Sequence, residues 1–452
     1  MKTKLLASVL TAALMAACAI GPNYARPEVP VPPAFRADPA VTADGASLAD
    51  LKWFELFKDE RLQDMIRTAL VHNFDLRDAV VRVELARANL GITRADQFPT
   101  IAASAGLTAQ RGRTLGTVTG DLLSFELDVW GRLRRATEAA RADLLAGDNF
   151  RKAVTTTLVS DVATAYFNVL ELDMELAIAR RTLQLREESL TIIRNRERGG
   201  LGTLLEVRQG EQLVYAAAQV IPEVEQLIEQ TENQLSLLLG GSPAGAARGL
   251  SLTDQEQPPA VPAGLPSDLL DRRPDILAAE QNLVAANATV GVAKAAYFPR
   301  ISLTGFLGFQ SDALSNLFSG PARIWQFAPQ VTQPIFNGGR LRSNVRLAAA
   351  QQEIALIEYQ RVIQTSFREV SDSLIQHQKV REIRTQQELL VATLRERSRL
   401  SYVRYRGGID TLLNALDADR DLFDAELRLT QTRRNELVAL VQLYRALGGG
   451  WQ

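Results

Sequence analysis

The chain has 452 residues, 46% of them apolar, which is enough for a large core. Its 51 Lys and Arg residues nearly balance 52 Asp and Glu residues, so no strongly basic composition indicates a nucleic-acid partner. The two histidines, His72 and His377, belong to no His-Glu-x-x-His motif, and no Walker loop occurs. One cysteine excludes a disulfide within the chain and a cysteine metal site. We therefore predict neither an enzyme nor a resident metal or other cofactor.

The N-terminus predicts export and a lipid anchor. Residues 1–17 carry Lys2 and Lys4, then a short apolar run and small residues, which is typical of a signal peptide. The ending Met15-Ala16-Ala17-Cys18 resembles a bacterial lipoprotein signal, so we predict diacylglyceryl and N-acyl groups on Cys18; the alternative is an incidental thiol. Each buried acyl CH₂ contributes about 0.8 kcal/mol, so several chains would anchor the protein firmly. Ala19 differs from the aspartate of inner-membrane retention signals, so we expect the outer membrane.

The mature chain begins with a proline-rich segment. We predict a lipid-anchored, extended N-terminal arm over residues 18–60, because prolines cluster up to residue 46 and prevent helix formation.

A first structural repeat is predicted over residues 61–241. A helical pattern over 61–95 ends at Phe98-Pro99, and apolar and small polar residues then alternate from Ile101 to Gln110, as in a strand. We read Gly112–Gly120 as a turn, followed by a second strand near residues 124–129. Residues 133–197 contain no proline and one glycine, so they predict a single very long helix with coiled-coil spacing, interrupted only at Arg186.

The same pattern returns after a proline-rich linker over residues 242–266, where a short element is expected near 250–253. We predict a second structural repeat over 267–448 and a C-terminal tail over 449–452. Gly131-Arg132-Leu133 recurs as Gly339-Arg340-Leu341, 208 residues later, whereas Phe98-Pro99 recurs after 200 residues. The extra eight residues must therefore lie inside the second strand hairpin, whose strands we place near 301–310 and 325–333.

The strands predict a membrane barrel that several chains share. Each strand has about ten residues, the length that crosses a bilayer in a tilted barrel. Four strands cannot close a barrel, and open edges are not tolerated in lipid. Two, three or four chains would give 8, 12 or 16 strands, and the strand pattern does not choose among them. The fold class is thus an α+β membrane protein with an internal tandem repeat.

Several motifs identify the family. The segments 124–134 (SFELDVWGRLR), 272–276 (RRPDI), 298–301 (FPRI), 336–341 (FNGGRL) and 446–451 (ALGGGW) resemble outer-membrane factors of the TolC/OprM/NodT type. Gly21-Pro22-Asn23-Tyr24 fits the lipoprotein branch of that family. The resemblance implies a homotrimer with a 12-stranded barrel, continued into the periplasm by a long α-helical coiled-coil barrel. It also implies a periplasmic membrane-fusion adaptor, an inner-membrane pump of the RND type, and export of drugs or other small toxic compounds.

The resemblance also assigns roles at the helix turns. Glycines permit tight turns at the ends of the long helices, which is the simpler interpretation of these residues. The resemblance implies that both tips contact the adaptor: Gly199, Gly200, Leu201, Gly202 and Thr203 in the first, and Gly407, Gly408, Ile409, Asp410 and Thr411 in the second. It further implies a periplasmic gate in which Leu413 forms an apolar ring and Asp417 a carboxylate ring, while Tyr405 and Glu206 hold helix pairs closed. Without the resemblance, Asp417 would read as a solvated helix residue.

Three alternatives remain from the sequence. A lipid-anchored periplasmic coiled-coil scaffold without a pore predicts no strand hairpins. A conduit for metal ions would be favoured by Met or His clusters, and only four Met occur. Protein secretion is the third.

Overall fold

The computed structural model describes residues 19–36, 47–111, 113–255 and 266–451. The predicted signal peptide and the predicted lipidation residue Cys18 lie outside these residues. The chain divides into two compact units. The first, which we call the sheet unit, comprises Met1–Pro30, Val80–Phe150 and Asp275–Ile363; the second, the helical unit, comprises Val31–Ala79, Arg151–Pro274 and Gln364–Gln452.

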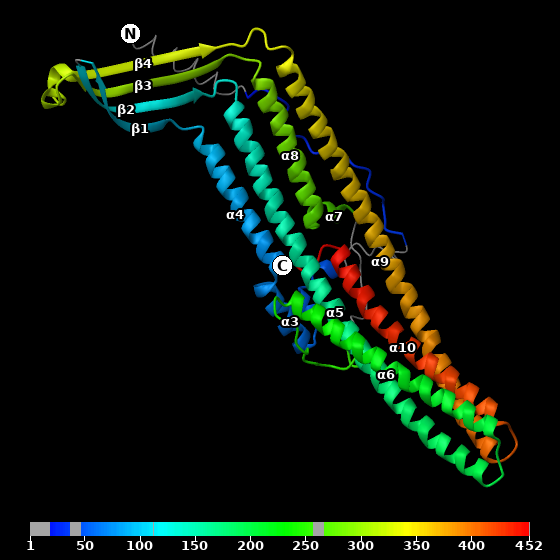
Figure 1. Ribbon diagram of the computed structural model, residues 1–452. Coiled ribbons are helices and arrows are strands. Elements are labelled where there is room, and N and C mark those ends of the chain that lie inside the picture. The colour runs from blue at the N-terminus through cyan, green and yellow to red at the C-terminus, as the bar shows by residue number, and fades with distance from the viewer. Residues whose placement is uncertain (1–18, 37–46, 112, 256–265, 452) are drawn as a thin grey trace. The chain divides into compact units, whose positions relative to one another are not determined.

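The sheet unit contains four antiparallel strands that lie side by side in chain order (Figure 1). They are β1 (Thr100–Gln110), β2 (Arg113–Leu127), β3 (Arg300–Ser311) and β4 (Arg323–Thr332). The pairing of β2 with β3, for example Val118 opposite Phe309, joins the two halves of the sequence in one sheet. Strands β1 and β4 therefore form the two edges of this sheet.

The predicted turn over residues 112–120 is wrong, because β2 already begins at Arg113. Thr117 pairs with Gly106, and Gly116 pairs with Leu107. The β-branched residues of this segment favour a strand, and β2 needs small partners: an added Cβ at Gly308 of β3 would come 2.1 Å from the carbonyl oxygen of Val118. The predicted strands near 301–310 and 325–333 are confirmed.

The two hairpins differ in their connections. In the first, Gln110 at the end of β1 pairs with Arg113 at the start of β2, whereas the second has a longer connection with two short 3₁₀ helices, η3 (Leu314–Asn316) and η4 (Gly320–Ala322). The longer connection occupies the interval in which the sequence places its extra residues.

The predicted continuous helices before each hairpin are wrong, since both are interrupted. The first is divided into α3 (Glu60–His72) and α4 (Phe74–Ala95), the second into α7 (Leu269–Arg272), which follows η2 (Pro266–Asp268), and α8 (Pro274–Ala295). At the first break Asn73 accepts a hydrogen bond from the Leu76 amide (3.0 Å) and donates one to the Leu238 carbonyl (3.0 Å), so it starts a new helix. At the second, Pro274 occupies the first position of α8, where its missing N–H costs little.

The predicted long helices are confirmed. Helices α5 (Arg132–Arg198) and α9 (Arg340–Arg406) have 67 residues each, and α6 (Leu204–Leu238) and α10 (Leu412–Ala446) have 35 each. Every bound in the second set lies 208 residues after its counterpart. Within the described ranges, none of the helices is long and apolar enough to cross a membrane.

The prediction of an extended arm over residues 18–60 needs a correction. Residues 22–32 have no regular secondary structure, but η1 (Leu48–Asp50) and α2 (Trp53–Leu56) follow. Ser47 and Asp50 form a capping box that starts η1, and Trp53 is buried, so this part of the segment packs as a folded element. The element expected near 250–253 is only a turn.

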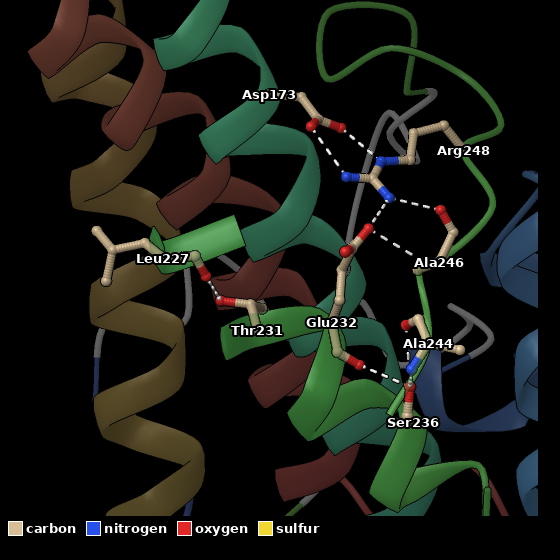
Figure 2. A network of polar contacts seen from close by, with 8 residues as sticks. All are labelled: Asp173, Leu227, Thr231, Glu232, Ser236, Ala244, Ala246 and Arg248. Carbon is tan, nitrogen blue, oxygen red and sulfur yellow. Dashed lines mark hydrogen bonds and ion pairs between the residues drawn. The ribbon is translucent and has the colours of Figure 1, made fainter. Parts of the chain in front are cut away.

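Within the helical unit, polar contacts hold the linker against helices α5 and α6 (Figure 2). Arg248 of the linker donates to both carboxylate oxygens of Asp173 on α5 (2.7 and 3.0 Å) and pairs with Glu232 on α6. The amide of Ala246 donates to Glu232 (3.1 Å), and that of Ala244 donates to Ser236 (3.1 Å). These bonds satisfy the backbone of a segment without regular structure.

Candidate functional site

The turn between α5 and α6, which we call the first tip, spans Arg198–Thr203. Gly200 has φ +72°, a conformation that suits glycine, and the amide of Leu201 donates back to the carbonyl of Arg196 (2.8 Å). Thr203 and Glu206 then form a capping box: the Glu206 amide donates to Thr203 Oγ1 (3.3 Å), and the Thr203 amide donates to the Glu206 carboxylate (2.7 Å). Glu206 therefore helps to cap the N-terminus of the helix to which it belongs, α6.

The turn between α9 and α10, the second tip, spans Arg406–Thr411. Gly408 has φ +70°, but Thr411 makes no side-chain cap. Asp410 instead accepts hydrogen bonds from Asn414 Nδ2 (2.6 Å), the Thr411 amide (2.8 Å) and Arg404 Nε (3.1 Å). These bonds, from Asn414 first, lower the pKa of Asp410 below its ordinary value. Both tips thus place a carboxylate on the amide of the N-cap residue, from different sequence positions.

Both tips also present apolar side chains to the surroundings. Leu201 is 73% exposed and Ile409 is 71% exposed. Isolated exposed apolar residues are common, but here one stands at the same place in each tip. A partner that covers the tips could bury both.

Tyr405 lies in a cluster where the two helix hairpins meet. Its side chain is 8% exposed, and the cluster comprises Leu190, Ile193, Val207, Val214, Tyr405, Leu412, Ala415 and Leu416. The Arg196 guanidinium lies over the Tyr405 ring, 5.2 Å from its centroid. Burial raises the pKa of Tyr405; Arg196 opposes this shift and the Glu206 charge adds to it. The structure thus brings Tyr405 close to Glu206, whose carboxylate caps α6, and a hydrogen bond between the two remains a prediction.

Leu413 and Asp417 lie one turn apart on α10, as their spacing predicts. Leu413 is 49% exposed. Asp417 pairs with Arg420 on the same helix (3.3 Å), so its carboxylate has a cation of the same chain beside it. The predicted rings of leucines and carboxylates require further copies of the chain and remain predictions.

Polar residues join α5 to α10, and sequence reasoning missed most of them. Arg186, 4% exposed at its side chain, pairs with Asp419 (2.8 Å), donates to the Leu213 carbonyl (2.9 Å) and lies over the Phe423 ring (5.0 Å). The one signal was the interruption of the apolar spacing at Arg186. Farther along, Glu171 faces Arg434 (3.7 Å).

One acid between α5 and α10, Glu171, has a strongly shifted pKa. Burial and the charge of Glu175, four residues away, raise the pKa of Glu171 to about 7, although Arg434 opposes the shift. Glu175 itself accepts a hydrogen bond from Gln431 on α10 (2.9 Å). The contact between the two hairpins therefore responds to charge as well as to packing.

The 124–134 motif has a physical basis at the junction of β2 and α5. Arg132 makes a bidentate pair with Glu126 (2.8 Å for each bond), and Asp128 accepts from the first free amides of α5, those of Leu133 (3.0 Å) and Arg134 (2.9 Å). Trp130 Nε1 donates to the Pro299 carbonyl (2.8 Å), which ties this junction to the start of β3.

Neither histidine lies in a metal-binding arrangement. His72 is the last residue of α3, and His377 lies within α9, where burial and Arg381 lower its pKa. In the part of the chain that the structure describes, no three His, Cys, Asp or Glu side chains are grouped so that they could hold a metal ion.

Comparison with known proteins identifies the family. The model of the outer membrane efflux protein family matches residues 65–241 and 265–449. The chain is 38% identical to the probable efflux pump outer membrane protein TtgC of Pseudomonas putida, over 100% of this chain and 96% of TtgC. It is 35% identical to the cation efflux system protein CusC of Escherichia coli, over 96% of both. The open-state structure of the Neisseria gonorrhoeae MtrE outer membrane channel matches with a TM-score of 0.89 and 33% identity, over 96% of this chain and 99% of that one.

These matches cover nearly the whole chain, and they include both strand hairpins and both long helix pairs. A poreless periplasmic scaffold is overturned, since it predicted no hairpins and the matching structures are membrane channels. The family is one of transport components rather than of enzymes. The chain therefore belongs to the outer membrane efflux protein family and is an outer-membrane channel component of an efflux system.

Proposed function

We propose that three copies of this chain form a passive exit duct for drugs and other small toxic compounds, within a three-part export system. The observation that carries the trimer is the four-stranded sheet, whose edge strands β1 and β4 lack neighbours among the described residues. Unpaired strand edges are costly in lipid, and pairing β4 of one copy with β1 of the next removes them. Three copies supply the 12 strands that the family resemblance implies.

The helices carry apolar surface that such an assembly would cover. On α4 the side chains of Val81, Leu85 and Ile92 are 64%, 61% and 66% exposed. Their spacing places them along one face of the helix. The equal lengths of α5 and α9, and of α6 and α10, support a duplicated half-protein whose halves alternate around the wall.

The two tips are the proposed docking points for a periplasmic adaptor, and the adaptor in turn joins an inner-membrane pump of the RND type. Exposed Leu201 and Ile409 supply apolar contacts. Lipidation at Cys18 would anchor the assembly in the outer membrane.

The proposed gate consists of Leu413 and Asp417, with Tyr405 and Glu206 holding neighbouring helix pairs together. Three Asp417 carboxylates near one axis repel each other and attract cations. Arg420, 3.3 Å from Asp417, partly neutralises this charge. The family resemblance implies a second acid three residues before Asp417, and this chain has Asn414 there. The gate should therefore bind divalent cations weakly.

Organic cargo is proposed because relatives named for antibiotic and toluene efflux are 38% identical to this chain. The likeness to the cation efflux protein CusC keeps metal ions as a second candidate.

Conductance in planar bilayers tests the duct and the gate together. The detergent-purified protein should give small, cation-selective steps that millimolar divalent cations reduce, and Asp417→Asn should remove that reduction. The double variant Glu206→Ala, Tyr405→Phe should conduct more than the wild type. A complete absence of steps, even from the double variant, would contradict the duct. Unchanged conductance would remove Glu206 and Tyr405 from the gate.

Growth assays separate the cargo classes. A strain that lacks its own outer-membrane channel, complemented with this chain and its pump partners, should regain tolerance to antibiotics or toluene. Recovery of tolerance to transition-metal salts alone would favour the second candidate.

A further inference from the structure

The first described residues of the chain lie against the sheet unit rather than free of it. The Ile20 amide donates to the carbonyl of Trp130 (3.0 Å) at the junction of β2 and α5. Ala19 lies beside Gly131, where an added Cβ would come 2.8 Å from the Ala19 Cα. The chain thus contacts the junction from its first described residue onward.

A contact between two glycines follows. Gly21 has φ +111°, and an added Cβ on it would come 2.5 Å from the Cα of Gly291 on α8. A Cβ added to Gly291 would lie 2.9 Å from the Ile20 carbonyl oxygen. The two backbones therefore touch, and a larger residue at either position would separate them.

Buried polar groups hold the same segment on both sides. Arg135 of α5, which is 4% exposed, donates through Nη2 to Asn23 Oδ1 (2.7 Å). Asn287 of α8, also 4% exposed, donates to the Pro22 carbonyl (3.0 Å). Such buried side chains cost free energy unless they are bonded, so these contacts indicate a site adapted to the segment.

An ion pair completes the contact. Glu280 of α8 is 9% exposed and accepts hydrogen bonds from Tyr24 Oη (3.1 Å) and Arg26 Nη2 (2.8 Å). A buried carboxylate that accepts two hydrogen bonds, one of them from a charged guanidinium, holds its partners more strongly than an exposed ion pair does.

The corresponding helix of the first half lacks this site. Helix α4 runs 200 residues ahead of α8. At the matching positions it carries Val80 in place of Glu280 and Arg87 in place of Asn287. Gly91, which matches Gly291, has no atom within 4 Å of an added Cβ. The site is therefore a specific feature of α8 and is not a by-product of the helix pattern.

We infer that residues Ala19–Arg26 form a docked strap, and that its contacts with α8 and with the β2–α5 junction fix the position of the attached lipid. The lipid part of this inference rests on the proposed acylation of Cys18, which directly precedes Ala19 in the sequence. A lipid on Cys18 would therefore be attached one residue before the docked strap.

Photo-crosslinking in the full-length protein tests the strap. A benzophenone-bearing phenylalanine at position 24 keeps an aromatic ring there and should, after irradiation of intact cells, form an intrachain cross-link to the peptide that contains α8. Gly291→Val should reduce this cross-link to the level of an unirradiated sample, because valine would displace Gly21. Gly91→Val, the same change at the matching open position, should leave the cross-link unchanged.

A charge reversal tests the strap independently, in case the Gly291→Val protein does not fold. Arg26→Glu and Glu280→Arg should each weaken the cross-link, and the double variant should restore it. Failure of restoration, together with an unaffected Gly291→Val cross-link, would overturn the strap.

Labelling with radioactive palmitate distinguishes this inference from the proposed lipidation. Palmitate on Cys18 without a cross-link in the wild type would overturn the strap and leave lipidation standing. A cross-link without palmitate would overturn the lipid-positioning part and leave the docked segment.

Discussion

The hairpin α5–α6 and the hairpin α9–α10 have the same lengths but different polar chemistry. Each turns at a glycine with positive φ, Gly200 at +72° and Gly408 at +70°. In the first tip Glu206 bonds the N-cap amide, and in the second Asp410 does so from the other side of the cap residue. At the positions 208 residues apart, Asn414 matches Glu206 and Gly202 matches Asp410.

This difference shows that the backbone of the turn can stay the same while the carboxylate that binds the N-cap amide comes from a different sequence position. The turn needs glycine at one position and an acceptor for one amide, and either neighbour can supply that acceptor. Farther along the helices, buried Arg186 of the first hairpin corresponds to Leu394 of the second, and Glu171 corresponds to Lys379. The first long helix therefore carries the buried charges that meet α10.

The largest effect should follow from breaking the Arg186–Asp419 pair. Asp419→Ala leaves an almost fully buried guanidinium without its carboxylate, which typically costs about 3–5 kcal/mol. Unfolding of the detergent-purified protein by heat or denaturant measures this loss. Glu211→Ala, at the matching position of α6, breaks only pairs with exposed arginines and should have a much smaller effect. Equal effects of the two variants would refute the distinction.

Glu171 should make stability depend on pH. Its pKa of about 7 in the folded protein lies above the ordinary value of 4.5, so the folded state keeps a proton that the unfolded state releases. Stability should fall as the pH rises between these two values. Glu171→Gln should therefore raise the melting temperature at pH 8 and change it little at pH 4.5.

A control is Glu382→Gln on α9, where the carboxylate is exposed and paired with Lys379. It should change the melting temperature little at both pH values. A Glu171→Gln protein that is less stable than the wild type at pH 8 would contradict the argument.

A smaller, local effect should distinguish the two caps. Thr203→Ala removes the side-chain bond to the Glu206 amide and should destabilise the start of α6 by about 1 kcal/mol. Hydrogen exchange of the first turn of α6 should accelerate. Thr411→Ala should leave exchange at the start of α10 nearly unchanged, because the Thr411 side chain makes no cap. The same acceleration at both tips would show that the caps are alike.

The smallest effect is expected from converting one tip into the other. Glu206→Asn alone should expose the Thr203 amide to exchange. Adding Gly202→Asp supplies a carboxylate from the position that Asp410 occupies in the second tip, and removal of Glu206 clears the oxygen that lies 3.0 Å from a Cβ at residue 202. Exchange of the Thr203 amide should return toward the wild-type rate, and an amide that stays unprotected would mean that the two turns are not interchangeable.

The sequence alone predicted the elements that depend on local pattern. Long proline-free runs predicted α5 and α9, alternation predicted β1 and β3, and the repeat of the hairpin predicted β4. The sequence prediction failed at residues whose type is common in one kind of structure but which occupy another. Gly116 and Thr117 look like turn residues but belong to β2 and pair with Leu107 and Gly106 of β1. Asn73 looks like a helix residue but starts a new helix through contacts with Leu76 and Leu238.

The candidate site shows the same division. The glycines of the tips and the spacing of Leu413 and Asp417 follow from the sequence, because turns and helix faces are local properties. The Thr203-x-x-Glu206 spacing is also a local capping-box signature that the sequence prediction did not use. The burial of Tyr405 and the Arg186–Asp419 pair do not follow from the sequence, because each depends on partners more than 200 residues away.

The sequence by itself determined the class of this protein: an exported chain with paired long helices, strand hairpins and the motifs of an outer-membrane efflux family. Only the tertiary structure decided which charges are buried between the hairpins and that the segment after Cys18 docks on α8 but not on α4. The physical reason is range. Periodicity and turn chemistry act within a few residues, whereas burial and ion pairing depend on which distant segments the fold brings together.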